Sequence, residues 1–281
     1  MLTASKEINI TPKVKIGGTK SFFLIGGPCV IESREKTLFL AKEIKKVCSL
    51  LEIPFIFKAS YDKANRSSIR SYRGPGIDEG LKILRQVKEE VDVPVLSDVH
   101  ETCQVEKAAE VLDVLQIPAF LCRQTDLLFA AARSGKPANI KKGQFLSPYD
   151  MKNIIEKFLS QGSSNIILTE RGTCFGYHNL VFDVRTIPVM KQWSFPVVID
   201  ASHSVQKPGG QGEVSGGEAE FISYIAQAGV SVGADGVFLE IHDSPETALS
   251  DGLNSLILNK LQPLLKTLLE IRAALLKSLS Y

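Results

Sequence analysis

The chain has 281 residues, of which 44% are hydrophobic and 23% charged, as in an ordinary globular protein with a sizeable core. A net charge of +2 is too small to indicate a nucleic-acid partner or an anionic membrane surface. No apolar run approaches the roughly 20 residues of a membrane span, and the first 18 residues lack the apolar core of a signal peptide. We therefore expect a cytoplasmic protein whose five cysteines stay free thiols, because none are paired at C-x-x-C spacing.

The first predicted element is a short hairpin, INITPKVKI (8–16), with Pro12 and Lys13 at its turn and a place at the bottom of the fold. Eight apolar runs follow, and each changes to polar residues near its end. Such continuous apolar runs are typical of strands that are buried on both faces. The predicted strands are Phe22–Gly27, Phe55–Ser60, Pro94–His100, Val114–Phe120, Ala138–Phe145, Asn165–Gly172, Pro196–His203 and Gly236–His242.

Amphipathic stretches, such as residues 35–51 and 78–91, separate these runs, and Cys48 lies on the inner side of the first one. Alternating strands and helices indicate parallel strands with helical crossovers. Eight such units favour an α/β fold of the (β/α)8 TIM barrel type, with an open doubly wound sheet as the alternative. The end of the chain, Leu253–Leu279, is predicted as one amphipathic helix. Since no linker or repeat interrupts the pattern, we expect residues 1–281 to form a single catalytic domain.

Two connections are longer than the short loops that usually follow barrel strands. The first, YDKANRSSIRSYRGPGI, covers residues 61–77, and the second, SVQKPGGQGEVSGG, covers residues 204–217. Both follow strands, so both should lie at the C-terminal face of the barrel, where active sites are found. The second loop is rich in glycine but lacks the spacing of a phosphate-binding P-loop, which favours a mobile lid.

Four residues with metal-binding side chains should meet at this face. In a closed barrel the last strand lies beside the first and the seventh, so Cys29, His203 and Glu240 come from neighbouring strand ends, and Asp251 can reach them. A thiolate, an imidazole and two carboxylates suit a divalent transition metal. In that interpretation the small residues of IGGPCVIES (25–33) leave room for a metal and a ligand. The alternatives are a buried thiol, an ordinary hydrogen-bonded histidine and an aspartate that caps the next helix.

A second group is cationic. Positive charge gathered at one face of a nearly neutral chain indicates a small anionic substrate, and Arg and Lys are the usual ligands of phosphate and carboxylate. The triplet Asn65, Arg66 and Ser67 offers hydrogen-bond donors in a tight loop, as a phosphate site needs. A solvated surface position is the expectation for Lys142 and Arg70. The cations at or just after strand ends are Lys58, Lys63, Arg66, Lys141 and Arg171.

The motifs around these residues resemble the 3-deoxy-D-manno-octulosonate 8-phosphate synthase family. They are GGPCVIES, FKASYDKANRSS, GPGIDEGLKIL, LSDVHE, LQIPAFLCRQTDLL, LTERGTCFGY, DASHSVQ and LEIHDSPETALSDG, and they extend from about Gly26 to Leu253. The resemblance implies a TIM barrel, usually a homotetramer. It also implies condensation of phosphoenolpyruvate with D-arabinose 5-phosphate, with release of phosphate, on the route to the Kdo sugar of lipopolysaccharide.

The resemblance also assigns residues. Members with a cysteine at the position of Cys29 are metal-dependent, which implies a divalent Fe, Mn, Co or Zn ion held by Cys29, His203, Glu240 and Asp251. The positions that hold phosphoenolpyruvate correspond to Lys58, Lys63, Gln116, Ala119, Lys141 and Arg171, and those that hold the acceptor phosphate to Asn65, Arg66 and Ser67. We predict Asp98, Lys63 and His203 as the catalytic residues. The KANRS loop, in place of the KPRT-type loop of the related heptulosonate synthases, favours the five-carbon acceptor.

Two other functional classes remain open at this level. One is a Schiff-base lyase with Lys58 or Lys141 as the amine nucleophile, although neither lysine has apolar enough sequence surroundings to favour it. The other is a non-catalytic barrel that binds sugar phosphates. Trapping with borohydride would identify the first, and a phosphate-release assay with both substrates would separate the second from the synthase.

Overall fold

A computed structural model describes residues 4–19, 22–66, 68–174, 179–211 and 214–278 of the chain. Eight parallel strands form one sheet, and β11 pairs with both β8 and β14, so the sheet closes into a barrel. The predicted TIM barrel is thus confirmed, and the open-sheet alternative is wrong. The barrel strands are β3 (Phe23–Gly27), β4 (Phe55–Lys58), β5 (Val95–Asp98), β6 (Val114–Ile117), β7 (Ala138–Lys141), β8 (Ile166–Glu170), β11 (Val197–Asp200) and β14 (Gly236–His242).

All eight predicted strands are present, and most end a few residues earlier than the apolar pattern suggested. Every residue of these strands is buried, because helices cover the outer face and side chains fill the barrel. The polar residues that follow the apolar runs therefore lie at the C-terminal rim of the barrel.

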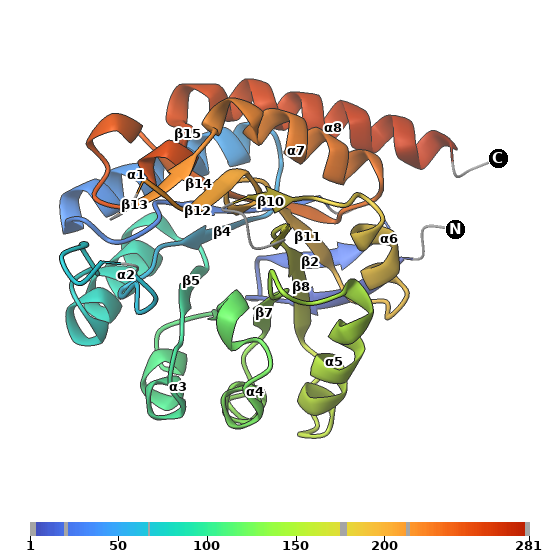
Figure 1. The fold of residues 1–281 in the computed structure, drawn as a ribbon, viewed down its shortest axis with the longest axis horizontal. Coiled ribbons are helices and arrows are strands. Elements are labelled where there is room, and N and C mark those ends of the chain that lie inside the picture. Colours follow the sequence, from blue (N-terminus) through green and yellow to red (C-terminus); the bar gives the residue numbers. More distant parts are fainter. Residues whose placement is uncertain (1–3, 20–21, 67, 175–178, 212–213, 279–281) are drawn as a thin grey trace.

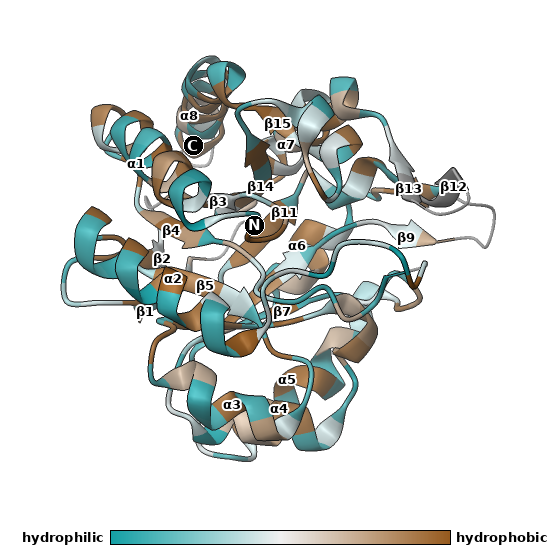
Figure 2. Ribbon diagram, turned by 90° about the vertical axis from the view of Figure 1, so that its left-hand side faces the viewer, coloured by the Kyte–Doolittle hydropathy of each residue, from teal (hydrophilic) through white to brown (hydrophobic). Residues whose placement is uncertain are grey.

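Helices surround the barrel in the order of the chain (Figure 1). In α1 the hydroxyl of Ser33 accepts a hydrogen bond from Lys36 N at 3.1 Å, which satisfies one free N–H of the first turn. Cys48 of α1 is buried, as predicted. Polar and apolar residues alternate along the helices, as covering helices require (Figure 2). The helices are α1 (Arg34–Leu50), α2 (Ile77–Val91), α3 (Thr102–Ala109), α4 (Thr125–Arg133), α5 (Met151–Leu159), α6 (Thr186–Lys191), α7 (Ile222–Ser231) and α8 (Leu261–Ser278).

The predicted N-terminal hairpin is also present, and it closes the bottom of the barrel. Strands β1 (Ser5–Asn9) and β2 (Lys15–Gly18) pair antiparallel. The side chains of Ile8, Ile10 and Ile16 are buried in one cluster with apolar residues of the barrel strands. Apolar side chains therefore fill the N-terminal end of the barrel, and an active site can form at the opposite end.

The C-terminal segment differs from its prediction as a single helix over Leu253–Leu279. Leu256–Ile257 form a short strand, β15, which pairs with Ile241 and His242 of β14, and α8 begins only at Leu261. Leu256 is buried in this pairing, and its burial and hydrogen bonds outweigh local helix propensity. The last residue of the predicted range, Leu279, lies outside the described part.

The two long connections both lie at the C-terminal face. The first folds back on itself, with Lys63 N donating to Arg73 O at 2.7 Å and Gly76 N to Tyr61 O at 3.0 Å. The second contains an antiparallel pair of strands, β12 (Gln206–Gln211) and β13 (Val214–Gly217), whose register shifts between Lys207 and Gln211. A smaller pair, β9 (Thr173–Cys174) and β10 (Leu180–Val181), lies between β8 and α6.

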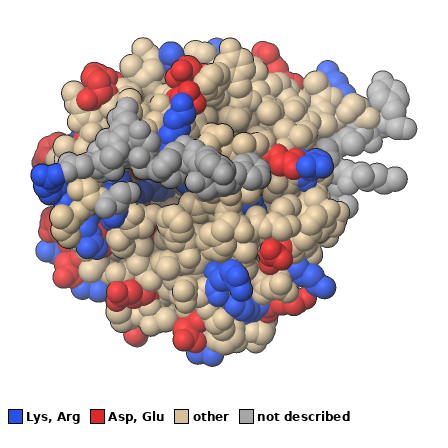
Figure 3. Space-filling model, viewed as in Figure 1, with Lys and Arg blue, Asp and Glu red and all other residues tan. Residues whose placement is uncertain are grey.

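Lys and Arg side chains alternate with Asp and Glu over the face seen in Figure 3, in keeping with the small net charge. Among the described residues, no helix is both long and apolar enough to cross a bilayer.

We expect the hairpin plug to contribute measurably to stability. Ile16→Ala should lower the free energy of unfolding by about 2–5 kcal/mol, because it leaves a cavity at a fully buried position. The matched control is Lys15→Ala, at the exposed position one residue earlier, which should change the free energy of unfolding by less than about 1 kcal/mol. Urea unfolding of both variants measures the difference, and equal values would show that the plug is not part of the cooperative core.

Candidate active site

A cavity of about 640 Å³ opens at the C-terminal end of the barrel. Almost all of the predicted site residues line it, although they come from seven strands and their following loops. Ser67 lies outside the described residues. The predicted residues that line the cavity are Lys58, Lys63, Asn65, Arg66, Asp98, Gln116, Ala119, Lys141, Arg171, His203 and Asp251.

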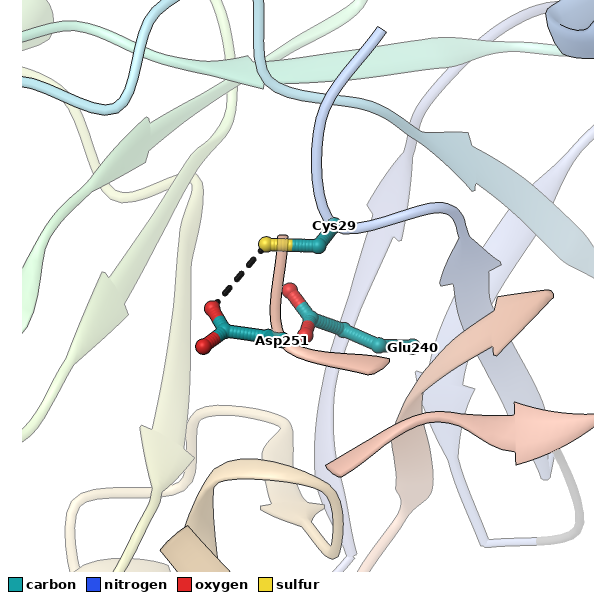
Figure 4. A group of neighbouring side chains, drawn as sticks. All are labelled: Cys29, Glu240 and Asp251. Atoms are coloured by element: carbon teal, nitrogen blue, oxygen red, sulfur yellow. Dashed lines mark hydrogen bonds between the residues drawn. The ribbon is translucent and has the colours of Figure 1, made fainter. Parts of the chain in front are cut away.

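Cys29, Glu240 and Asp251 bring one ligand atom each to within 4.8 Å of one another at the edge of this cavity. The three side chains point toward one another, and the Cys29 Sγ lies 3.1 Å from Asp251 Oδ2 (Figure 4). Cys29 follows β3, Glu240 lies in β14, and Asp251 lies in the loop before β15. Barrel closure between β3 and β14 makes this grouping possible, as the sequence predicted.

His203, the fourth predicted ligand, lies outside that compact group but next to it. Its Nε2 is 3.4 Å from Glu240 Oε1, and its Nδ1 is 2.8 Å from Asp200 Oδ2. A carboxylate at one ring nitrogen fixes the orientation of an imidazole, so that the other nitrogen faces the site. Asp200 therefore directs His203 Nε2 toward Glu240.

The donors fit a divalent transition metal. Glu240 Oε2 is buried and has no hydrogen-bond partner among the described residues, an arrangement that a cation would relieve. Burial, with the nearby charges of Asp251 and Glu240, raises the pKa of the Cys29 thiol. Burial also acts to raise the pKa of Asp251, but Lys63 and His203 outweigh it and lower that pKa to about 2. A thiolate beside two carboxylates needs a positive charge, which a bound metal supplies.

The glycines before Cys29 have a different role from the one predicted. A Cβ on Gly27, whose φ is +152°, would collide with the carbonyl oxygen of Lys58 in the neighbouring strand. A Cβ on Gly26 would come within 3.0 Å of Ile241 and 3.2 Å of Leu24. The glycines permit close strand packing, and they do not make room for a metal.

Two lysines at the floor of the cavity are buried and paired with carboxylates. Lys58 Nζ lies 3.1 Å from Glu240 Oε1 and donates to Cys29 O at 2.7 Å. Lys141 Nζ pairs with Asp200 and lies 3.3 Å from the centre of the Phe238 ring. Burial lowers the pKa of Lys141 to about 8, although Asp200 opposes the shift. Both lysines are therefore members of buried ion pairs at the floor of the cavity.

The remaining cations face the same cavity. Burial acts to lower the pKa of Lys63, but the charges of Cys29, Glu240 and the nearby aspartates outweigh it and raise that pKa. Arg171 donates to Gln206 Oε1 at 3.0 Å, and its NH1 is buried without a partner among the described residues. Arg66 contacts Ser250 Oγ and lies 3.8 Å from Asp251 Oδ2. The cations that line the cavity, with the unpartnered NH1 of Arg171, suit an anionic ligand.

The profile of the DAHP synthetase I family matches residues 4–277. The chain is 59% identical to a 2-dehydro-3-deoxyphosphooctonate aldolase of Geotalea uraniireducens over 95% of its length and 98% of that protein. It is 60% identical to the enzyme of the same name in Pelobacter propionicus, over 92% of this chain and 96% of the relative. A third relative of that name, from a Cyanothece species, is 55% identical over 96% of this chain and 98% of its own length.

The chain belongs to the DAHP synthetase I family. Within that family it groups with the 2-dehydro-3-deoxyphosphooctonate aldolases, another name for the synthases whose motifs it resembles. It is therefore an enzyme, and the alternative of a non-catalytic sugar-phosphate-binding barrel is wrong.

Asp98, the predicted proton-transfer residue of this family member, lies at the floor of the cavity. Its carboxylate accepts hydrogen bonds from Ser60 Oγ at 2.6 Å and from Gln116 Nε2. Burial acts to raise the pKa of Asp98, but Lys63, Lys58 and His100 outweigh it and hold that pKa well below its usual value. Asp98 is therefore an anion that can accept hydrogen bonds.

The prediction for Lys142 is wrong. Its side chain is 0% exposed, and Nζ lies 3.5 Å from Glu170 Oε2 and donates to Gly143 O and Leu146 O. Successive side chains of a strand point to opposite faces, so Lys141 points into the barrel and Lys142 points toward the covering layer, where it pairs with Glu170. Arg70 is exposed, as predicted. The capping alternative for Asp251 is also wrong, because its side chain makes no cap hydrogen bond.

Two residues that contribute to the active site were not identified from the sequence. Asp200 lies near the end of the predicted strand Pro196–His203, but its contacts with Lys141 and His203 depend on the barrel. Ser250 lies 2.9 Å from Cys29 Sγ and also accepts from Arg66, which connects the thiol with the long first loop. Its position beside Asp251 was the only sequence signal available.

Acid should destabilise the fold through these buried carboxylates. Asp98 has a lower pKa in the folded chain than in the unfolded one, so its stabilisation is complete above the unfolded pKa of about 3.9. It is lost as the pH falls toward the folded pKa, at up to about 1.4 kcal/mol per pH unit. Asp98→Asn should therefore flatten the decline of unfolding free energy below pH 4. Asp150→Asn, at an exposed position, is the control. The same decline of unfolding free energy with pH in both variants would contradict the lowered pKa of Asp98.

Proposed function

We propose that this enzyme condenses phosphoenolpyruvate with D-arabinose 5-phosphate and water to give 3-deoxy-D-manno-octulosonate 8-phosphate and phosphate. The product is a precursor of the Kdo sugar of lipopolysaccharide. The observation that carries the proposal is one cavity that joins a cluster of phosphate-binding cations to a cysteine–carboxylate group. The names of its close relatives support the same reaction.

The cations divide the substrates between two parts of the cavity. Lys141 and Arg171 bind the phosphate and carboxylate of phosphoenolpyruvate, and Lys58, Lys63, Gln116 and Ala119 complete that subsite. Arg66 binds the phosphate of the acceptor together with Asn65 and Ser67. Holding both substrates in one geometry converts a reaction between two molecules into a step within one complex. The KANRS sequence of the acceptor loop favours a five-carbon sugar phosphate over a four-carbon one.

Cys29, His203, Glu240 and Asp251 would hold a divalent metal, with Fe²⁺, Mn²⁺, Co²⁺ and Zn²⁺ as the candidates. When bound, such an ion supplies Lewis-acid polarisation of an oxygen or a water of lowered pKa. Asp200 keeps the ring of His203 in the orientation that this ligand set needs.

The chain's own residues direct the bond changes. With phosphoenolpyruvate clamped by Lys141 and Arg171, its C3 attacks the aldehyde carbon of the sugar, and positive charge develops at C2. The buried carboxylate of Asp98 lies beside this centre and assists proton transfer, with Lys63 as the neighbouring cation. Water adds at C2, and the resulting hemiketal phosphate loses phosphate by cleavage of its C2–O bond, which leaves the keto group of the product.

A Schiff-base mechanism is the second candidate, because a lysine with a pKa near 8 is partly neutral at physiological pH. The buried ion pair with Asp200 favours the charged form of Lys141 and so favours a role in anion binding. Borohydride should not trap either substrate on the enzyme, and a covalent adduct at Lys141 or Lys58 by mass spectrometry would reverse this preference.

We also propose that the chain acts as a single catalytic domain, in the cytoplasm, and as a homotetramer. Small phosphorylated substrates are its partners, and nucleic acid is not one of them, in keeping with the small net charge. Sedimentation analysis of the purified protein tests the tetramer.

The reaction is tested by following phosphate release with both substrates present. We expect release only when both are added, together with the eight-carbon product. Phosphoenolpyruvate labelled with ¹⁸O at the bridging position should give phosphate that keeps the label, because water attacks C2. Solvent oxygen in the phosphate would mean attack at phosphorus and would overturn the roles of Lys141 and Arg171.

Metal dependence is tested by chelation and by matched cysteine variants. Chelation should abolish turnover, and Mn²⁺, Fe²⁺, Co²⁺ or Zn²⁺ should restore part of it. Cys29→Ala should lower metal affinity at least about tenfold, since it removes the thiolate ligand. Cys48→Ala, a buried cysteine in α1, is the control and should bind metal as the wild type does. Full activity in protein shown by elemental analysis to be metal-free would contradict this proposal.

The acceptor subsite is tested at Arg66. Arg66→Ala removes a charge-assisted phosphate contact of about 1.5–3 kcal/mol, so the KM for arabinose 5-phosphate should rise about tenfold to a hundredfold. The KM for phosphoenolpyruvate should change much less. Exposed Arg70→Ala, in the same loop, is the control. An equal rise in KM for both substrates would show that the loop binds both phosphates or only holds the site together.

A further inference from the structure

A row of five buried polar side chains crosses the barrel at the level of the cavity floor. Each comes from a neighbouring strand or from the residues just after it. Only two of them, Asp98 and Gln116, line the cavity, while the other three lie behind it. The next layer toward the hairpin is apolar, so these polar groups are not required to fill the barrel. In order around the barrel, the row consists of Ser60, Asp98, Gln116, Asn139 and Thr169.

The hydrogen bonds of the row all run toward Asp98, from Thr169 on one side and from Ser60 on the other. Thr169 Oγ1 donates to Asn139 Oδ1 at 2.6 Å, and Asn139 Nδ2 donates to Gln116 Oε1 at 2.8 Å. Gln116 Nε2 then donates to Asp98 Oδ1. Because an ionised carboxylate only accepts, the NH₂ group of Gln116 must face Asp98, and its carbonyl must face Asn139. The orientation of both amides is therefore set along the row, between the Thr169 hydroxyl and the Asp98 charge.

This arrangement determines what Gln116 can offer to a ligand. Its carbonyl oxygen is occupied by Asn139, and one N–H is occupied by Asp98. The second N–H is the part of the amide that the row leaves for a ligand in the cavity. A donor attracts the oxygens of an anionic substrate, whereas a flipped amide would present its carbonyl oxygen and repel them.

We propose that Asn139 and Thr169 are positioning residues that lock the amide of Gln116 as a hydrogen-bond donor to phosphoenolpyruvate. The inference rests on the proposed function, which places that substrate against Gln116. Neither residue touches the cavity, so neither contacts the substrate, and each acts through the residue before it in the row. Asn139 lies two residues before Lys141 on β7, so the same strand supports both the amide and the cation.

Replacement of the hydroxyl of Thr169 tests the inference with little change of volume. Thr169→Val leaves the carbonyl of Asn139 without a donor, so that only Asp98 at the other end still orients the two amides and the hold on Gln116 weakens. The dissociation constant of phosphoenolpyruvate, measured by calorimetry without acceptor, should rise on the order of fivefold to tenfold. The KM for arabinose 5-phosphate should stay within about twofold of the wild-type value. Thr169→Ser keeps the hydroxyl and should recover most of the lost affinity, which a role in packing alone would not explain.

A matched control separates this effect from a general loss of stability. Thr37 of α1 is also buried, and its Oγ1 also donates a 2.6 Å hydrogen bond, to Ser33 O. Thr37→Val should lower stability in a similar way but leave the affinity for phosphoenolpyruvate unchanged. Asn139→Leu is the second variant, and it should weaken binding at least as much as Thr169→Val, since it frees the carbonyl of Gln116 directly.

The outcomes distinguish the inference from the function on which it rests. Wild-type affinity in either Thr169→Val or Asn139→Leu would overturn the inference alone. An equal loss of affinity for both substrates would also overturn it, because the row would then only hold the barrel together. A wild-type protein that binds no phosphoenolpyruvate would overturn the proposed function itself, and the inference with it.

Discussion

The active site depends on an alternation of buried basic side chains with carboxylates, which begins with Lys141 and ends with Lys58. Lys141 pairs with Asp200, Asp200 contacts His203, His203 contacts Glu240, and Glu240 pairs with Lys58. Burial would neutralise either carboxylate alone, but the neighbouring cations lower the pKa of both. An isolated buried charge costs several kcal/mol, so the lysines and carboxylates are stable there because each has a partner of opposite sign, Lys141 with Asp200 and Lys58 with Glu240.

This alternation connects the two halves of the proposed chemistry. At one end Lys141 faces the proposed subsite for phosphoenolpyruvate, and at the other Glu240 belongs to the group that would hold the metal. Asp200 contributes to both halves, because it compensates the charge of Lys141 and fixes the orientation of the His203 ring. The site therefore has a preorganised arrangement of charge before any ligand enters, which is the condition for strong electrostatic stabilisation of a transition state.

The barrel separates stability from chemistry along its axis. The N-terminal end is filled by the isoleucines of the hairpin and by apolar strand residues. The C-terminal end holds polar and charged side chains, in part without partners among the described residues, such as Glu240 Oε2 and Arg171 NH1. Because packing at one end stabilises the whole barrel, the other end can retain groups whose hydrogen bonds are left for ligands.

The sequence by itself determined the eight strands, the hairpin, the positions of the polar strand ends and the residue types of the site, since these depend on local patterns of apolar and polar residues. It did not determine the start of α8 at Leu261, because pairing of Leu256 with β14 is a contact between segments. It also misplaced Lys142, since the neighbouring strand β8 supplies its partner Glu170. Only barrel closure decided which strand ends meet, and so which charges Asp200 compensates, because those contacts join residues far apart in the chain.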